Sequence, residues 1–233
     1  MKNKIFQFVW YYIVRPCIPI PSIKKEINPV IRHGREIYAQ IRLARFIGQI
    51  EGFLAGDSNS AVFSTFMVMQ RFSTLTLAIG QGGATADDWV AFFMTDRGRY
   101  VYKAMIARGV TVVWNIGGNY VLQGTVDNAV AGLHALHNLF LSSWFCTIPP
   151  IYASVLGKIS EVAGFPERDE KYYRQGVLYV NGLIETLARP RVIDLYHQFV
   201  TDTGAPLFGA LQDLVHFRRV SVDFIRMQLG GVI

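Results

Sequence analysis

The stretch F-L-A-G-D-S-N-S-A-V-F, residues 53–63, decides the fold of this chain. An apolar run ends abruptly in Gly56-Asp57-Ser58-Asn59, and apolar periodicity then resumes. This pattern is typical of a buried strand that is followed by a turn and a helix. Asp57 and Ser58 then have two interpretations, because they either cap the new helix, the commonest use of such residues, or belong to an active site.

Segments of strand-like and helix-like character alternate along the rest of the chain. The apolar patterns predict strands at 50–55, 75–79, 110–116, 144–148 and 192–195, and helices at 61–72, 86–93, 126–139, 177–188 and 217–229. The third of these strands is apolar almost throughout, as is typical of a parallel strand covered on both faces. The alternation predicts a doubly wound α/β fold.

Polar or glycine-rich clusters follow three of the predicted strands, and a fourth lies near the C-terminus. They are Gly56-Asp57-Ser58-Asn59, Gly80-Gln81-Gly82-Gly83, Gly117-Gly118-Asn119-Tyr120 and Asp213-Leu214-Val215-His216. In doubly wound sheets, ligands bind outside the carboxyl ends of the strands. We therefore expect these clusters to gather at one edge of the sheet.

In order and residue type, the four clusters resemble the four short blocks of the SGNH, or GDSL-type, hydrolase superfamily, over about residues 48–230. The segments W-F-C-T-I-P-P and V-L-Y-V-N-G-L-I-E-T-L-A also resemble family segments. The resemblance implies a three-layer αβα sandwich with a mostly parallel five-stranded sheet in flavodoxin-like order. It departs from the family at Tyr120, where Asp is frequent, and at Phe217, where Pro or Leu is frequent.

The resemblance also implies a role for each block. Ser58 would be the nucleophile, with Asp213 and His216 as its acid and base. The oxyanion hole would consist of the backbone amides of Ser58 and Gly83 and the side-chain amide of Asn119. These residue types suit the chemistry, because a serine hydroxyl needs a neighbouring base and a developing oxyanion needs donors fixed in advance.

A second D-x-x-H pair, Asp194 and His197, competes for the catalytic role. It follows the segment R-V-I, which has the character of the last strand, whereas Asp213 and His216 directly precede the predicted closing helix. The family carries its catalytic pair at the latter place. We therefore expect Asp213 and His216 to act, and Asp194 to mark the end of the last strand.

These features together predict a serine esterase that forms an acyl-enzyme on a small-molecule or lipid-like ester. The alternatives within the superfamily are a carbohydrate O-acetylesterase and an acyltransferase. An alternative of another class is a catalytically silent adaptor that attaches to a membrane or a protein partner. An intact set of nucleophile, base and oxyanion donors favours the enzyme over the adaptor.

The N-terminal extension, residues 1–47, differs from the predicted catalytic domain, residues 48–233. It holds nine of the chain's 23 Lys and Arg but only two of its 17 Asp and Glu, so it carries a charge of +7 and the remainder −1. Aromatic residues between basic ones within residues 1–28 suit an anionic membrane surface or packing against a protein. No nucleic-acid-binding motif accompanies the basic residues, so no nucleic-acid partner is expected.

The sequence also bears on localisation and on cofactors. The N-terminal extension offers no convincing cleavable signal peptide, which favours a cytoplasmic or peripheral membrane-associated protein. Cys17 and Cys146 do not form a disulfide framework. His134 and His137 lie three residues apart on a predicted helix without further ligands, and neither a metal nor another cofactor is expected.

Overall fold

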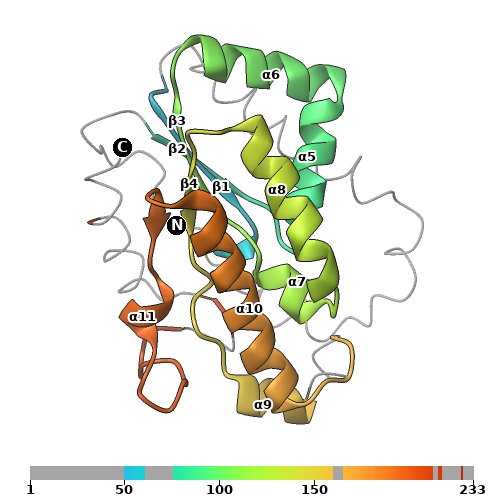
Figure 1. Ribbon diagram of the computed structural model, residues 1–233, viewed down its shortest axis with the longest axis vertical. Helices are drawn as coiled ribbons and strands as arrows, with labels where there is room; N and C mark the ends of the chain where they lie inside the picture. Colours follow the sequence, from blue (N-terminus) through green and yellow to red (C-terminus); the bar gives the residue numbers. More distant parts are fainter. Residues whose placement is uncertain (1–49, 61–75, 160–164, 212–214, 217–226, 228–233) are drawn as a thin grey trace, which may run out of the picture.

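The computed structural model describes residues 50–60, 76–159, 165–211, 215–216 and 227 (Figure 1). A five-stranded parallel sheet lies at its centre, in the order β2-β1-β3-β4-β5. The strands are β1 (Gly52–Gly56), β2 (Thr76–Gly80), β3 (Thr111–Asn115), β4 (Trp144–Cys146) and β5 (Val192–Ile193). The predicted α/β fold with a parallel sheet in flavodoxin-like order is confirmed.

The described helices alternate with the strands. They are α5 (Ala86–Met94), α6 (Asp96–Ala107), α7 (Gly118–Leu122), α8 (Ala129–Leu139), α9 (Ala153–Ile159), α10 (Glu170–Ala188) and α11 (Tyr196–Phe199), with a 3₁₀ turn at Val126–Asn128. The predicted helix at 61–72 and nearly all of that at 217–229 lie outside the described residues. The predicted N-terminal extension, residues 1–47, also lies outside them, so the division of the chain into two segments stays a prediction.

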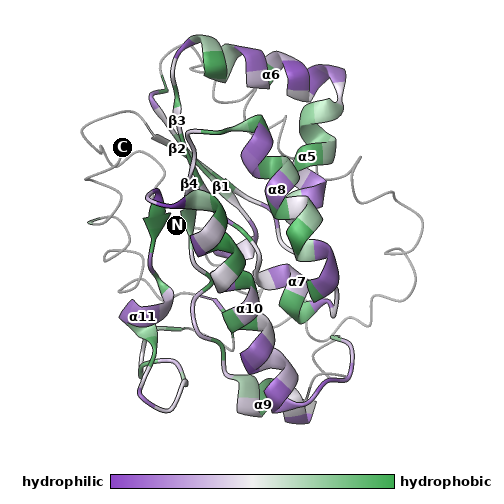
Figure 2. Ribbon diagram, viewed as in Figure 1, coloured by the Kyte–Doolittle hydropathy of each residue, from purple (hydrophilic) through white to green (hydrophobic). Residues whose placement is uncertain are grey.

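The sheet separates two groups of buried side chains, because successive residues of a strand point to opposite faces. On one face, Phe53, Trp114 and Phe145 pack with α5, α8 and α10, and Figure 1 shows these helices in front of the sheet. On the other face, Leu54, Val113, Cys146 and Ile193 pack against Leu195, Phe199, Ala210 and Leu211. The strands are accordingly apolar along their length, whereas α10 has both hydrophobic and hydrophilic residues (Figure 2).

Helix α6 was not predicted from the sequence. Its first turn contains Gly98, which weakens helix propensity, but the Thr95 side chain accepts a hydrogen bond from the Gly98 N–H and caps the helix. Helix α10 begins seven residues earlier than predicted, because the Asp169 side chain caps it by accepting from the Tyr172 N–H. In both cases a capping side chain stabilises a helix start that the apolar pattern does not indicate.

The strand order fixes where a site forms. The chain runs from β1 to β2 on one side of the sheet and from β3 to β4 on the other side. The connections that leave the carboxyl ends of the neighbours β1 and β3 therefore lead in opposite directions across the sheet. Such a reversal opens a crevice at the carboxyl ends of the two strands. Ser58 follows β1 and Asn119 follows β3, so both predicted site residues lie at this crevice.

Candidate active site

The ends of β1 and β3 approach each other closely. Gly56 pairs with Asn115, and a Cβ at Gly56 would lie 1.8 Å from the Asn115 carbonyl oxygen. That oxygen accepts hydrogen bonds from the Asp57 N–H at 3.1 Å and from the Ser60 hydroxyl at 3.4 Å. The glycine before Asp57 is therefore required by the contact with β3, and it brings the turn after β1 against the third strand.

Ser58 opens a short helical turn, residues 58–60, at the end of β1. Asp57 Oδ1 accepts the backbone N–H of Asn59 at 2.9 Å, so Asp57 satisfies a donor of that turn, as the capping interpretation expected. Ser58 itself is half-buried, and its hydroxyl makes no hydrogen bond to any described residue. The capping and the nucleophile interpretations are thus compatible, because the Asp57 side chain caps the turn and leaves the Ser58 hydroxyl available.

The second cluster follows β2 and forms a turn in which Gly83 has φ +82°. This conformation lies in the left-handed region that favours glycine. Two side chains hold the turn: Gln123 Nε2, from the residue after α7, donates to the Gly83 carbonyl at 2.7 Å, and Asn119 Nδ2 of α7 donates to the Ala84 carbonyl at 2.8 Å. The two predicted oxyanion segments are therefore joined directly, through contacts that the sequence did not reveal.

Asn119 lies in the first turn of α7 and is buried. Its Nδ2 atom carries two hydrogens, of which the bond to Ala84 uses one. The next residue, Tyr120, donates a hydrogen bond of 2.6 Å from its buried hydroxyl to Asp87 Oδ2 at the start of α5. Burial and the Asp87 carboxylate raise the pKa of Tyr120, so the hydroxyl stays protonated as the donor. Tyr120 thus has a partner of its own where the family often has Asp.

The C-terminal cluster reaches the same edge of the sheet. Asn59 Nδ2 donates to the Val215 carbonyl at 3.2 Å, which holds the residue before His216 against the turn that contains Ser58. The positive charge of His216 acts on the Asp57 carboxyl. Asp213 lies outside the described residues, so its predicted place beside His216 stays a prediction.

Asp57 is an unusual carboxyl, because it is buried at the end of β1. Burial raises the pKa of Asp57 from 3.8 to about 6, although the N–H of Asn59 and the charge of His216 both lower it. Near pH 6 this group exchanges its proton. The charge of the residue before Ser58 therefore changes with pH around 6.

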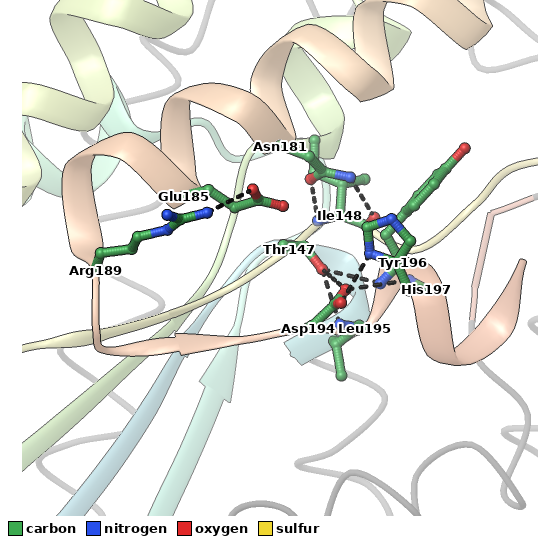
Figure 3. Close-up of polar contacts among 9 residues, drawn as sticks. All are labelled: Thr147, Ile148, Asn181, Glu185, Arg189, Asp194, Leu195, Tyr196 and His197. Carbon is green, nitrogen blue, oxygen red and sulfur yellow. Dashed lines mark hydrogen bonds and ion pairs between the residues drawn. The ribbon is translucent and has the colours of Figure 1, made fainter.

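The competing pair, Asp194 and His197, lies at the carboxyl end of β5 (Figure 3). Asp194 Oδ2 and His197 Nδ1 are 2.8 Å apart, and Thr147 and the His197 N–H also bond to Asp194 Oδ1. In the sheet order, β5 is separated from β1 by β3 and β4, which is about 14 Å at the usual strand spacing. Asp194 therefore ends the last strand, as expected, while Ser58 lies three strands away.

The histidine pair and the cysteine of the described part of the chain lie in α8 and β4, outside the turn that contains Ser58. No group of three or more His, Cys, Asp or Glu there is placed to hold a metal ion. The pKa of His137 is lowered, first by burial and then by His134 and Arg191. Cys146 is buried in β4, and burial raises the pKa of its thiol to about 12, so it is protonated at neutral pH.

A pocket opens at the crevice between β1 and β3. Its polar lining consists of Asp57, Ser58, Asn59 and Asn119. Gly118 and Val215 also line it, so three of the four sequence clusters contribute to one pocket. Gly83 is not among the described lining residues, so its predicted place in the oxyanion hole stays a prediction. No helix in the described ranges is long and apolar enough to cross a membrane.

Comparisons with known proteins identify the fold. No family model matches the sequence, and the comparison with curated proteins found no match. A solved structure of a proposed platelet activating factor from Streptococcus pneumonia superposes with a TM-score of 0.60 at 13% identity, over 87% of this chain and 94% of that one.

Two further solved structures have similar values. A proposed acylhydrolase from Bacteroides fragilis gives a TM-score of 0.56 at 16% identity, over 78% of this chain and 85% of that one. A proposed lipolytic protein of the G-D-S-L family from Desulfitobacterium hafniense gives 0.53 at 10% identity, over 78% and 99%. The resemblance of this chain to SGNH hydrolases, predicted from its four sequence blocks, is thereby confirmed at the level of the fold.

Proposed function

We propose that this protein is a serine ester hydrolase that cleaves a carboxylic ester through an acyl-enzyme on Ser58. The observation that carries the proposal is the convergence of Ser58, Asn119 and Val215 on one pocket, with His216 adjacent to Val215. These residues come from the ends of β1 and β3 and from the C-terminal loop. A turn that merely capped a helix would not need an amide donor and an imidazole from remote segments beside it.

The proposed reaction begins with attack of the Ser58 hydroxyl oxygen on the ester carbonyl carbon, while His216 takes the hydroxyl proton. The carbonyl oxygen becomes an oxyanion, which accepts hydrogen bonds from the backbone amides of Ser58 and Gly83 and from Asn119 Nδ2. His216 then gives its proton to the leaving alcohol. Water deacylates Ser58 in the same two steps, and Asp213 orients the imidazole and stabilises its positive charge.

The contacts around the donors support this scheme. Asn119 keeps one Nδ2 hydrogen for an oxyanion, because the other is bound to Ala84. The same contact and that of Gln123 fix the turn that carries Gly83, so the donors are oriented before substrate binds. Fixed donors stabilise charge without reorganisation, and removal of one such donor costs about 10²–10³ in rate.

The decisive experiment compares Ser58→Ala with the wild type on p-nitrophenyl acetate. Loss of a serine nucleophile should lower kcat by about 10⁴-fold or more. Ser142→Ala is the matched control, because Ser142 is exposed in the turn before β4 and far from the carboxyl edge of the sheet. Turnover by Ser58→Ala equal to that of the control would refute the nucleophile, whereas absence of turnover by the wild type would favour the silent adaptor.

A further inference from the structure

The pocket beside Ser58 has one polar side and otherwise apolar walls. Its apolar lining is Leu122 from α7, Ile148, Pro149 and Ile151 from the segment after β4, Val177 from α10, and Val215. The pocket measures about 330 Å³ when the open space in front of it is counted, and about 20 Å³ as a cavity volume. None of the described lining residues is basic. The reactive groups therefore face a small apolar compartment in which no described side chain carries a positive charge.

The walls of this compartment are held by buried contacts. Asn181 Oδ1 accepts the Ile148 N–H at 2.6 Å, and Asn181 Nδ2 donates to the Ile148 carbonyl at 3.0 Å (Figure 3). Val177 and Asn181 are four residues apart in α10, so they share one face of the helix. At Gly176 a Cβ would lie 3.0 Å from Val121, which shows how closely α10 approaches α7. The pocket is thus formed before any ligand binds.

Resting on the proposed function, we infer that this pocket receives the acyl part of the ester and selects a short aliphatic acyl group. An aliphatic chain gains about fourfold in affinity for each CH₂ that it buries. A sugar in the same place would lose hydrogen bonds to water without replacement, because its hydroxyls would face Leu122, Ile151 and Val177. The alcohol part of the substrate then extends toward the opening.

Pocket size restricts the chain length. The cavity volume is about 20 Å³, and a cavity of about 10–15 Å³ already holds one water molecule, so the compartment is very small. Val177 and Leu122 are buried on opposing helices, and their side chains limit the compartment. A long acyl chain could enter only if one of these side chains were smaller.

The test measures kcat/KM for p-nitrophenyl acetate, butyrate and octanoate. The wild type should prefer acetate and butyrate to octanoate. Val177→Ala should raise the octanoate-to-butyrate ratio about tenfold, because a methyl-sized change in an apolar pocket alters selectivity by about 10- to 200-fold. Val101→Ala is the matched control, since Val101 is equally buried but lies in α6, away from the pocket.

Several results would overturn the inference. One is a wild type that hydrolyses octanoate as fast as butyrate, and another is an unchanged ratio in Val177→Ala relative to Val101→Ala. If the wild type hydrolyses none of the three esters, the proposed function fails, and the pocket is judged separately by saturation-transfer NMR with uncharged butyramide. The butyramide signal should then be present in the wild type and lost in a folded Val177→Phe protein; equal signals would refute the pocket as an acyl site.

Discussion

Asn59 Nδ2 donates a hydrogen bond of 3.2 Å to the carbonyl oxygen of Val215, which lies 156 positions further along the chain. Asn59 directly follows the proposed nucleophile, and Val215 directly precedes the proposed base. This bond therefore joins the first and the last of the four sequence clusters. It holds the residue before His216 against the residue after Ser58.

Asn59→Ala should lower kcat about tenfold and change kcat more than KM, because its bond to Val215 orients the loop of the proposed base. A hydrogen bond of this kind contributes about 1 kcal/mol, so the protein should stay folded. Steady-state kinetics with p-nitrophenyl acetate measures the effect. Asn138→Ala, an exposed change in α8, is the control, and equal kcat values for both variants would show that the bond does not orient His216.

Asp213→Asn and Asp194→Asn distinguish the two D-x-x-H pairs. If Asp213 sets the tautomer of His216, its replacement should lower kcat by about 10⁴-fold. Asp194→Asn should leave kcat nearly unchanged, because Asp194 bonds to Thr147 and His197 at the end of β5, three strands from β1. The reverse pattern of losses would assign the acid to Asp194.

Tyr120→Phe should lower both the melting temperature and kcat. It removes the 2.6 Å hydrogen bond to Asp87, and a bond to a charged group contributes about 1.5–3 kcal/mol. Asn119 is adjacent in α7, so a looser helix start should misplace the amide donor and change kcat more than KM. Tyr100→Phe, an exposed change in α6, is the control. A lower melting temperature with unchanged kcat would limit Tyr120 to a structural role.

Asp57 should make the protein less stable as pH rises from about 4 to 6. Its pKa is raised by burial from 3.8 to about 6, so the folded state holds the proton more tightly than the unfolded state does. The stabilisation by this proton is present below pH 3.8 and is lost as pH passes about 6, by about 3 kcal/mol in total.

Asp57→Asn should remove this dependence, since the amide oxygen can still accept the N–H of Asn59. Chemical unfolding at pH 4 and pH 7 measures it, and the variant should gain most over the wild type at pH 7. Asp127→Asn, at an exposed position, is the control. A wild type whose stability does not fall between these values relative to Asp57→Asn would contradict the effect of burial.

Much of the strand layout followed from local pattern. All five predicted strands are present, with ends that differ from the prediction by at most two residues, because apolar runs bounded by glycine and proline signal buried strands without reference to the rest of the chain. Helices α6, α7, α9 and α11 escaped prediction. Helix α6 depends on the Thr95 cap, and α7 and α11 are one turn long, too short to show an apolar period.

The candidate site was predictable in its residue types but not in its supporting contacts. Ser58, Gly83 and Asn119 stand in short motifs at strand ends, where sequence pattern is informative. Gln123 and Asn181 gave no such signal, although an amide on the buried face of α10 is unusual enough to have drawn notice. Their roles depend on carbonyl groups that lie 40 and 33 positions away.

The sequence by itself determined which chemical groups are present and that each follows a strand. It placed the G-D-S-N turn, the glycine turn, the asparagine and the final D-x-x-H in order along the chain. Only the tertiary structure decided which of them meet, because neighbours in a parallel sheet are set by strand order and not by distance in sequence. The order β2-β1-β3 puts Ser58 next to Asn119, and the position of β5 at the far edge separates Asp194 from both.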